Sequence, residues 1–395
     1  MIRDLTDAEA RAALLKWSAV PEGTIPAWVA EMDYAPAPAV TAAVAAALRT
    51  GRTGYPHLSL DGAEDDGSDT AALAGAFRGF AARHWGWDVP AGSLTLTPDV
   101  VTGLRVAVET LVPPGPVVLP TPCYPPFREL LALAAREVVA LPVDPDAPTA
   151  TLDLDRLEAA FAAGARGLLL CSPHNPLGRR WTRAELEAVR DLAERHGARV
   201  VADEVHAPLV LPEPDGAAAP DGSGGAGFTP YLAVDPRGIT VTSASKAFNV
   251  PGLACAHLVT PDPADAAALR GVVHSANHGV SRLGVAAGVA AWSDADDWLA
   301  ALVERLAAQR ALLADLLAAH LPQARTRPLE ATYLAWLDLR AYGVPDPAAA
   351  ARAHGAWPAP GQDYEPGLEG HVRLNLATTP ERLEALVERI ARALT

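Results

Sequence analysis

Residues 167–206 read GLLLCSPHNPLGRRWTRAELEAVRDLAERHGARVVADEVH, and this stretch decides the fold class. A short apolar run, Gly167–Cys171, comes first, a helical pattern follows over Arg183–His196, and a second apolar run covers Val200–Ala202. Two short apolar runs that flank an amphipathic helix are typical of parallel strands joined by a crossover helix. The stretch therefore predicts one unit of an α/β fold.

The same alternation continues on both sides of this unit. Four further apolar runs have the length of buried strands, and they lie at Leu94–Thr97, Val117–Leu119, Ile239–Thr242 and Ala256–Thr260. Helical patterns separate the strands, over Val100–Leu111, Phe127–Ala135, Leu154–Ala163 and Pro263–Gly271. Because crossover helices connect parallel strands, we expect a mainly parallel sheet with helices on both faces.

The carboxy-terminal third has a different pattern. It contains a long helical pattern over Asp296–His320, a strand-like run ATYLAWLDL at 331–339, and a last helix over Pro380–Leu394. We interpret this part as a smaller α+β domain. The expected domains are an amino-terminal segment 1–45 that joins the small domain, a large domain 46–285, and the small domain 286–395.

Composition and charge narrow the classes of function. The 395 residues carry a formal net charge of -15, which argues against nucleic acid as a partner. No apolar run approaches the roughly 18 residues that span a bilayer, and the acidic start MIRDLTDAEA differs from a signal peptide. We therefore expect a cytoplasmic protein without a membrane partner. Two polar stretches, 61–70 and 212–227, are predicted to be exposed loops.

The cysteine and lysine counts are both informative. Cys123, Cys171 and Cys255 show no CxxC spacing, which predicts reduced thiols and no metal site. Of 32 basic residues, only Lys16 and Lys246 are lysines. Arginine replaces lysine as a charge but cannot act as an amine nucleophile. A lysine kept in such a chain is a candidate for amine chemistry, although either lysine alone can survive by chance.

Polar residues follow the predicted strands, where the ligands of parallel sheets bind. After Leu94–Thr97, the run TPDVV opens a helix whose backbone N–H groups at Asp99, Val100 and Val101 can bind a phosphate. The ring of Tyr124 can stack on a planar group. The turns after the other strands contribute Asn175, Asp203, His206, Ser243, Ser245 and Lys246.

Each of these residues alone has an ordinary explanation as a cap, a turn former or a buried polar group. Together they match what pyridoxal 5'-phosphate requires. This cofactor needs an amine for a covalent imine, a carboxylate beside its pyridine nitrogen, and donors for its phosphate and phenolic oxygen. The sequence predicts this cofactor, with Lys246 as the amine and Asp203 as the carboxylate.

Several motifs also resemble a known family. In chain order, SPHNPLG (172–178), DEVH (203–206), SASKAFN (243–249) and HVRLNLATTP (371–380) resemble fold-type I pyridoxal-phosphate enzymes of the class I/II aminotransferase superfamily. A second set is similar to the branch of MalY/PatB-type cystathionine beta-lyases, which are carbon–sulfur lyases. These motifs are WVAEMDY (28–34), TPDVV (97–101), TPCYPPF (121–127) and EATYLAWLD (330–338).

The resemblance implies a role for each matching position. It makes Lys246 the catalytic residue that bonds the cofactor, and Asp203 the partner of the pyridine nitrogen. The implied cofactor-binding residues are Tyr55, Asp99, Val100, Val101, Tyr124, Asn175, Asp203, His206, Ser243, Ser245 and Lys246. The implied substrate-binding residues are Arg373, Asn175, Tyr124 and Ala30, with Arg373 clamping the α-carboxylate of an amino acid.

The resemblance also implies an assembly and a reaction. Tyr55 in RTGYPH is similar to a tyrosine that reaches the phosphate in the neighbouring subunit, which implies a homodimer with active sites at the interface. The implied reaction is β-elimination from an S-substituted L-cysteine, giving a thiol, pyruvate and ammonia. An aminotransferase, a secondary-metabolism enzyme acting on a cysteine conjugate, and a non-catalytic regulator remain alternatives.

Three positions depart from the family pattern. Asp99 stands where the phosphate-binding motif usually has glycine, and its carboxylate would repel a phosphate unless it points away. Ala254 occupies the position of a phosphate-binding arginine in many aminotransferases, and Glu31 replaces an aspartate. These departures affect the expected choice of substrate more than they affect the expected cofactor.

Overall fold

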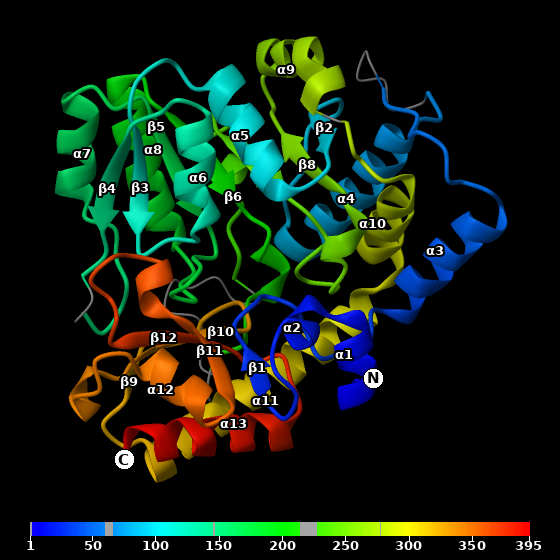
Figure 1. The fold of residues 1–395 in the computed structure, drawn as a ribbon. Helices are drawn as coiled ribbons and strands as arrows, with labels where there is room; N and C mark the ends of the chain where they lie inside the picture. The colour runs from blue at the N-terminus through cyan, green and yellow to red at the C-terminus, as the bar shows by residue number, and fades with distance from the viewer. Residues whose placement is uncertain (1, 60–65, 145–146, 214–226, 277) are drawn as a thin grey trace.

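The computed structural model describes residues 2–59, 66–144, 147–213, 227–276 and 278–395. Its elements form two sheets, each with its own helices (Figure 1). The larger sheet has seven strands in the order β2-β8-β7-β6-β5-β3-β4. These strands are β2 (Leu94–Thr97), β3 (Val117–Thr121), β4 (Val138–Pro142), β5 (Gly167–Cys171), β6 (Arg199–Asp203), β7 (Ile239–Thr242) and β8 (Ala256–Val259).

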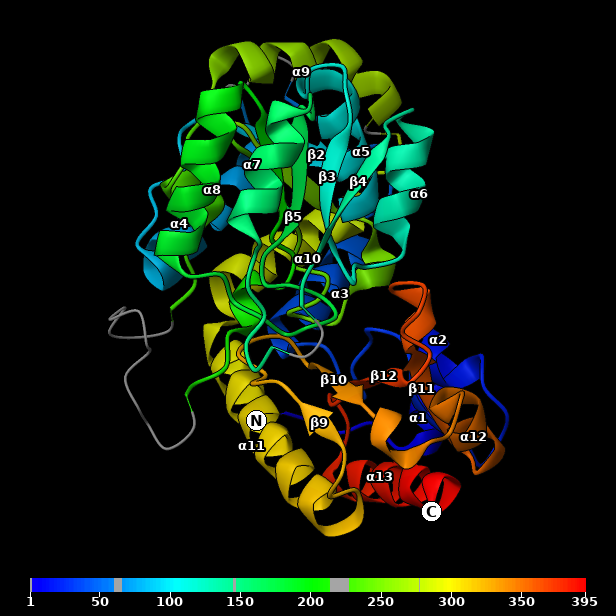
Figure 2. The same ribbon diagram turned by 90° about the vertical axis from the view of Figure 1, so that its left-hand side faces the viewer.

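Helices cover both faces of this sheet, as Figure 2 shows. They are α4 (Asp69–Trp85), α5 (Val100–Leu111), α6 (Pro126–Leu133), α7 (Leu154–Ala162), α8 (Arg183–His196), α9 (Pro263–Ala276) and α10 (Arg282–Asp294). Leu169 of β5 packs in the cluster that contains α5 and α6, whereas Leu168 and Leu170 pack in the cluster that contains α7 and α8. Burial on both faces explains why this strand reads as a continuous apolar run.

The pairing of the strands confirms the predicted fold class. β4, β3, β5, β6 and β7 are parallel, and β8 is antiparallel to both of its neighbours. Local signals fix the helix of the central unit: Thr182 and Glu185 form a capping box at the start of α8, and Gly197 ends it in the left-handed conformation with φ of 61°.

Several sequence predictions need correction at their bounds. β3 runs two residues beyond the predicted end, and α9 continues to Ala276. The predicted loop 61–70 is wrong at its end, because Asp69 and Thr70 begin α4 behind the cap Ser68. Asp69 is buried there, and it forms ion pairs with Arg52 and Arg282. Residues 60–65 of this loop, and 214–226 of the loop predicted at 212–227, lie outside the described residues.

The smaller sheet has five strands in the order β1-β11-β12-β10-β9. Its strands are β1 (Ile25–Ala27), β9 (Arg325–Thr326), β10 (Leu334–Asp338), β11 (Ala356–Pro360) and β12 (His371–Asn375). The remaining helices are α1 (Asp7–Ala13), α2 (Leu15–Ser18), α3 (Pro38–Arg49), α11 (Asp296–His320), α12 (Pro347–Ala353) and α13 (Pro380–Leu394). In the described part of the chain, no helix is long and apolar enough to cross a membrane.

The amino-terminal residues complete the smaller sheet, because β1 pairs with β11. The chain then passes through residues 28–34, here called the bridging segment, toward the larger sheet. Asn249 holds this segment by hydrogen bonds to Met32 and Tyr34. Asn375 of β12 donates to the carbonyl oxygens of Val29 and Glu31. The bridging segment is therefore bonded to both halves of the molecule.

A buried ion pair lies behind the bridging segment. Lys16 Nζ is 2.7 Å from Asp33 Oδ1, and the two side chains are 0% and 1% exposed. Asp33 also accepts hydrogen bonds from Trp17 Nε1 at 2.7 Å and Thr378 Oγ1 at 2.6 Å. Burial lowers the pKa of Lys16, and the charge of Asp33 opposes that shift. Lys16, the lysine of the chain other than Lys246, thus belongs to a structural ion pair.

We expect Lys16→Met to lower the free energy of unfolding by about 3 kcal/mol, because it leaves the buried Asp33 without its ammonium partner. The double variant Lys16→Met/Asp33→Asn should lose less free energy of unfolding than the single variant, since it leaves no unpaired buried charge at this pair. Chemical denaturation measures both. Equal losses in the single and double variants would contradict this explanation, and Arg195→Met in the exposed pair with Glu158 should change stability by less than about 1 kcal/mol.

A second buried carboxyl group lies directly after β6. Glu204 Oε1 accepts a hydrogen bond from the backbone N–H of Tyr231 at 2.7 Å. Burial raises the pKa of Glu204 to about 8, and the charge of Asp203 adds to the shift, while the N–H of Tyr231 and the hydroxyl of Thr240 oppose it. Glu204 is therefore protonated in the folded protein at neutral pH.

The raised pKa of Glu204 predicts a pH-dependent stability. Between its unfolded pKa of about 4.5 and its folded pKa of about 8, the folded state binds more protons than the unfolded state, so this group makes stability fall as pH rises. Glu204→Gln mimics the protonated form. Denaturation of the cofactor-free protein should show the variant gaining at least about 1 kcal/mol over the parent from pH 5 to pH 8. A constant difference between them would show that Glu204 does not titrate on unfolding.

Candidate functional site

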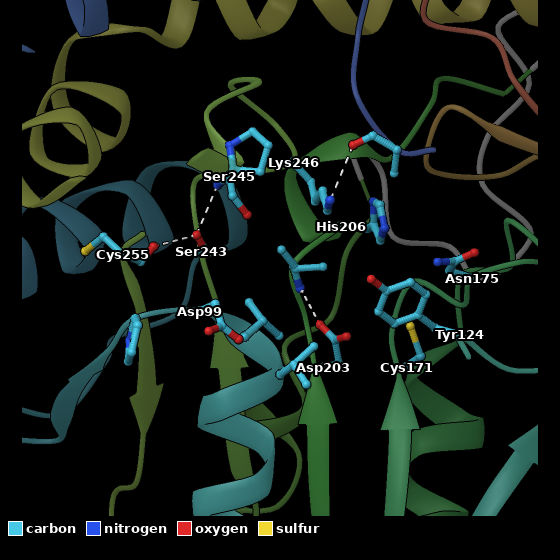
Figure 3. Close-up of a pocket in the computed structure, with 16 residues that line it drawn as sticks. Asp99, Tyr124, Cys171, Asn175, Asp203, His206, Ser243, Ser245, Lys246 and Cys255 are labelled. Atoms are coloured by element: carbon cyan, nitrogen blue, oxygen red, sulfur yellow. Dashed lines mark hydrogen bonds between the residues drawn. The ribbon is translucent and has the colours of Figure 1, made fainter. Parts of the chain in front are cut away.

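A pocket lies at the carboxyl ends of the parallel strands, beside the amino terminus of α5 (Figure 3). It brings together most of the residues that the sequence predicted as a site. Those lining it are Ala30, Asp99, Val100, Val101, Tyr124, Asn175, Asp203, His206, Ser243, Ser245 and Lys246. The residues come from the turns after β2, β3, β5, β6 and β7 and from the bridging segment.

Lys246 follows β7, lines the pocket and is partly buried. Its Nζ donates a hydrogen bond to the carbonyl oxygen of Ala30 at 3.3 Å. Burial lowers the pKa of Lys246, and the positive charge of Arg373 lowers it further, whereas Glu31 and Asp203 oppose the shift. The amine therefore loses its proton more readily than an exposed lysine, which makes it a better base and nucleophile at neutral pH.

Asp203 is the last residue of β6, where it pairs in register with Cys171. Its Oδ1 accepts a hydrogen bond from the backbone N–H of Val205 at 3.1 Å. Burial raises the pKa of Asp203 to about 6, and the N–H of Val205 and the charge of Lys246 limit the rise. A cationic group placed beside this carboxylate would offset its desolvation.

Two further polar side chains face the pocket. Burial lowers the pKa of His206 to about 3, so its ring is neutral at pH 7. Within the described residues, His206 Nδ1 is buried without a hydrogen-bond partner. The Oδ1 atom of Asn175 accepts a hydrogen bond from Arg373 Nη1 at 3.0 Å. The amide nitrogen of Asn175 is then the part of its side chain that can donate into the pocket.

The carboxylate of Asp99 is turned toward its own helix. It caps α5, because Oδ1 accepts from the backbone N–H of Thr102 at 2.8 Å and Oδ2 accepts from the Thr102 hydroxyl at 2.8 Å. The N–H groups of Val100 and Val101 belong to the first turn and have no partner within the helix. Both carboxylate oxygens of Asp99 are thus occupied, and the backbone at this helix end can still hold an anion.

Arg373 lies in β12 at the border of the pocket and does not line it. It is 3% exposed. Its Nη2 donates to the carbonyl oxygen of Trp28 at 2.6 Å, and the guanidinium lies over the ring of Tyr364, 4.9 Å from the centroid. Among the described residues, its Nε has no hydrogen-bond partner. A buried cation with a spare donor is suited to binding a carboxylate.

Tyr55 lies away from the pocket of its own chain. It is 92% exposed, although the loop that carries it is well anchored. Asp69 accepts hydrogen bonds from Arg52 Nη2 at 2.7 Å and from the backbone N–H of His57 at 2.8 Å. The structure therefore presents an aromatic ring outward on a loop fixed on both sides of it.

Sequence reasoning missed some residues of the pocket. Cys171 and Cys255 line it, and both are free thiols in the structure, as is Cys123. The position of Cys171 at the end of β5 was a signal that could have found it. Tyr333, inside the motif EATYLAWLD, lies directly behind the pocket wall, where its hydroxyl donates to the carbonyl oxygen of Ala30 at 3.1 Å.

Comparisons with known proteins identify relatives over nearly the full length of the chain. The cystathionine beta-lyase of Corynebacterium glutamicum is 32% identical over 384 residues, which cover 96% of this chain and 96% of that protein. The cystathionine beta-lyase PatB of Bacillus subtilis is 32% identical over 381 residues, with 94% and 92% covered. The similarity to this lyase branch therefore extends over nearly the full length, as the motifs implied.

The structural comparison concerns the fold. The crystal structure of cystalysin from Treponema denticola, which contains pyridoxal 5'-phosphate, superposes with a TM-score of 0.87 at 23% identity, covering 100% of this chain and 99% of that one. The fold-type I architecture expected from the motifs is thereby confirmed. The family model described as aminotransferase class I and II matches residues 32–390. The chain belongs to the aminotransferase class I and II family.

Proposed function

We propose that this protein uses pyridoxal 5'-phosphate to catalyse β-elimination from an S-substituted L-cysteine such as cystathionine, with a thiol, pyruvate and ammonia as products. The observation that carries the proposal is the amine of Lys246, which lies in one pocket with Asp203 and His206. The two relatives named as cystathionine beta-lyases support a sulfur-containing substrate.

The pocket fits this cofactor chemically. The buried Nδ1 of His206 has no partner among the described residues, so the pocket provides a polar atom that a bound group can satisfy. Asp203 offers a carboxylate deep in the site, and the free N–H groups of α5 suit a phosphate. We assign cofactor binding to Lys246, Asp203, Asn175, His206, Tyr124, Ser243, Ser245 and the backbone at Asp99, Val100 and Val101.

When bound, the cofactor supplies an electron sink for the pair left at the substrate's α carbon. Lys246 would hold the cofactor, and its free amine would act as the base that removes the α proton of the substrate. Its lowered pKa favours the neutral form of the amine, which this step needs. Asp203 would keep the pyridine nitrogen protonated, and Asn175 and His206 would hold the phenolic oxygen.

Arg373 is assigned to the α-carboxylate of the amino acid. It is already oriented by Asn175 and Trp28, and its Nε remains without a partner in the described structure. A guanidinium held in this way forms directed, charge-assisted hydrogen bonds with a carboxylate. We assign Tyr124 and Ala30, on the pocket wall, to the substrate as well.

We further propose a homodimer in which Tyr55 of each subunit reaches the phosphate end of the other subunit's pocket. The support is its 92% exposure on a loop fixed by Asp69. Tyrosine is enriched in the interfaces between protein subunits relative to the rest of the surface.

An aminotransferase is the second candidate, because the matching family model carries that description. The same lysine would then move the α proton to the cofactor's aldehyde carbon, with no leaving group on the substrate. The two reactions differ in whether a keto acid acceptor is required.

Release of pyruvate and thiol from L-cystathionine and S-alkyl cysteines decides between them. We expect sustained turnover by the cofactor-loaded protein with no keto acid added. A single turnover that resumes only when a keto acid is supplied would identify an aminotransferase. Lys246→Ala should abolish turnover, and borohydride reduction should no longer attach the cofactor to the peptide containing residue 246. Attachment at any other residue would contradict the assignment.

We expect Arg373→Lys to raise KM for the amino acid at least tenfold, with a smaller effect on kcat, because a lysine cannot reproduce the forked hydrogen bonds. Arg136→Lys is a matched control, since Arg136 bonds only backbone carbonyls at the end of α5. Steady-state kinetics measure both. An unchanged KM for Arg373→Lys would refute the carboxylate assignment.

A further inference from the structure

The carbonyl oxygen of Ala30 accepts two hydrogen bonds at the pocket wall. One comes from Lys246 Nζ at 3.3 Å, marked by a dashed line in Figure 3, and the other from the Tyr333 hydroxyl at 3.1 Å. Among the hydrogen bonds of the described residues, this oxygen is the acceptor for the Lys246 amine. The orientation of a single peptide group therefore decides where the free amine rests.

The position of Tyr333 depends on an unusual backbone conformation at the preceding residue. Thr332 has a φ of 71°, a left-handed conformation that a β-branched residue rarely adopts. It is held there by its N–H, which donates to the carbonyl oxygen of Leu209 at 2.8 Å, and by its hydroxyl, which accepts from the N–H of Leu334 at 3.0 Å. Conformations of this kind persist where the surrounding structure requires them, often at functional sites.

The Tyr333 side chain is equally fixed. It is 1% exposed, and its ring packs edge-on against the His206 ring with the centroids 6.1 Å apart. Burial raises the pKa of Tyr333 well above its usual value, so the hydroxyl keeps its proton and remains a donor. A rigid donor thus holds the carbonyl oxygen that receives Lys246.

We propose that Tyr333 is a positioning residue, whose hydroxyl fixes the Ala30 carbonyl at the place where the free amine of Lys246 rests. The proposal deepens the proposed function and rests on it, because the displaced lysine must be placed over the substrate's α carbon to move a proton. Tyr333 does not line the pocket and acts through Ala30.

The effect of Tyr333 can be separated from the charges around Lys246. Those charges come from Arg373 of β12, Glu31 of the bridging segment and Asp203 of β6, while His206 is neutral. Tyr333→Phe changes none of them. Loss of the hydroxyl frees the Ala30 peptide to turn, and the protonated amine, which needs an acceptor more than the neutral amine, loses its stabilisation.

The first test uses the cofactor-free protein and the rate at which a small acylating reagent labels Lys246 at neutral pH. Mass spectrometry resolves the site, since the chain has only one other lysine, Lys16, which is buried in its pair with Asp33. We expect Tyr333→Phe to increase the labelling rate at least threefold. Tyr231→Phe is the matched control, because it removes a buried hydroxyl that donates to Asp235 Oδ2 at 3.3 Å, outside the pocket lining and the bridging segment.

The second test uses the cofactor-loaded enzyme. Tyr333→Phe should lower kcat about tenfold and leave KM within twofold, whereas Tyr231→Phe should change neither. Unchanged labelling, or equal changes in the two variants, would overturn the proposal. If no turnover of any kind is found, the proposed function fails, but labelling still decides the role of Tyr333. Should Tyr333→Phe fail to fold, Tyr333→Met, which also lacks the hydroxyl, takes its place.

Discussion

Parallel pairing of β5, β6 and β7 is the constraint on which the site depends. Because these strands run in one direction, the turns that carry Asn175, Asp203 and Lys246 meet at one edge of the sheet. Burial of both sheet faces also excludes water from that edge. Desolvation then disfavours the charged form of each group, which lowers the pKa of Lys246 and raises that of Asp203. A cofactor with complementary charges would offset the free-energy cost of desolvating these groups.

The bridging segment turns this edge into an enclosed site. Its backbone carbonyls, rather than its side chains, contact the reactive groups: Trp28 bonds Arg373, and Ala30 bonds Lys246. Asn249 and Asn375 hold it from the two halves of the molecule. A change in the relative position of the two sheets would therefore move the residues assigned to substrate and cofactor. Glu31, the departure from the family motif, has its side chain bonded to the backbone N–H of Lys16 at 2.8 Å.

Much of this arrangement could be predicted from local sequence. The strands of the larger sheet are continuous apolar runs, and polar turns after them named most of the pocket. β1, β4, β9, β11 and β12 were missed because they are short, contain proline or include polar residues, and only tertiary pairing makes them strands. The scarcity of lysine pointed to Lys246 and Lys16 alike, and only the folded structure separates them, because Lys246 lines the pocket whereas Lys16 pairs with Asp33. Tyr333 was quoted within a motif, yet its role depends on the backbone of Thr332, which no residue pattern reveals.

The bridging segment makes many of its contacts with parts of the chain that are synthesised much later. Its partners are Asn249 and residues 373–378, so its contacts span more than 200 and about 340 residues of sequence. Contacts of such separation form late, because a long loop must close before they can stabilise anything. The local contacts of Asp33 with Lys16 and Trp17 can form early, whereas the contact of Trp28 with Arg373 must wait until β12 has been synthesised. The border of the pocket at Arg373 is therefore completed late in folding.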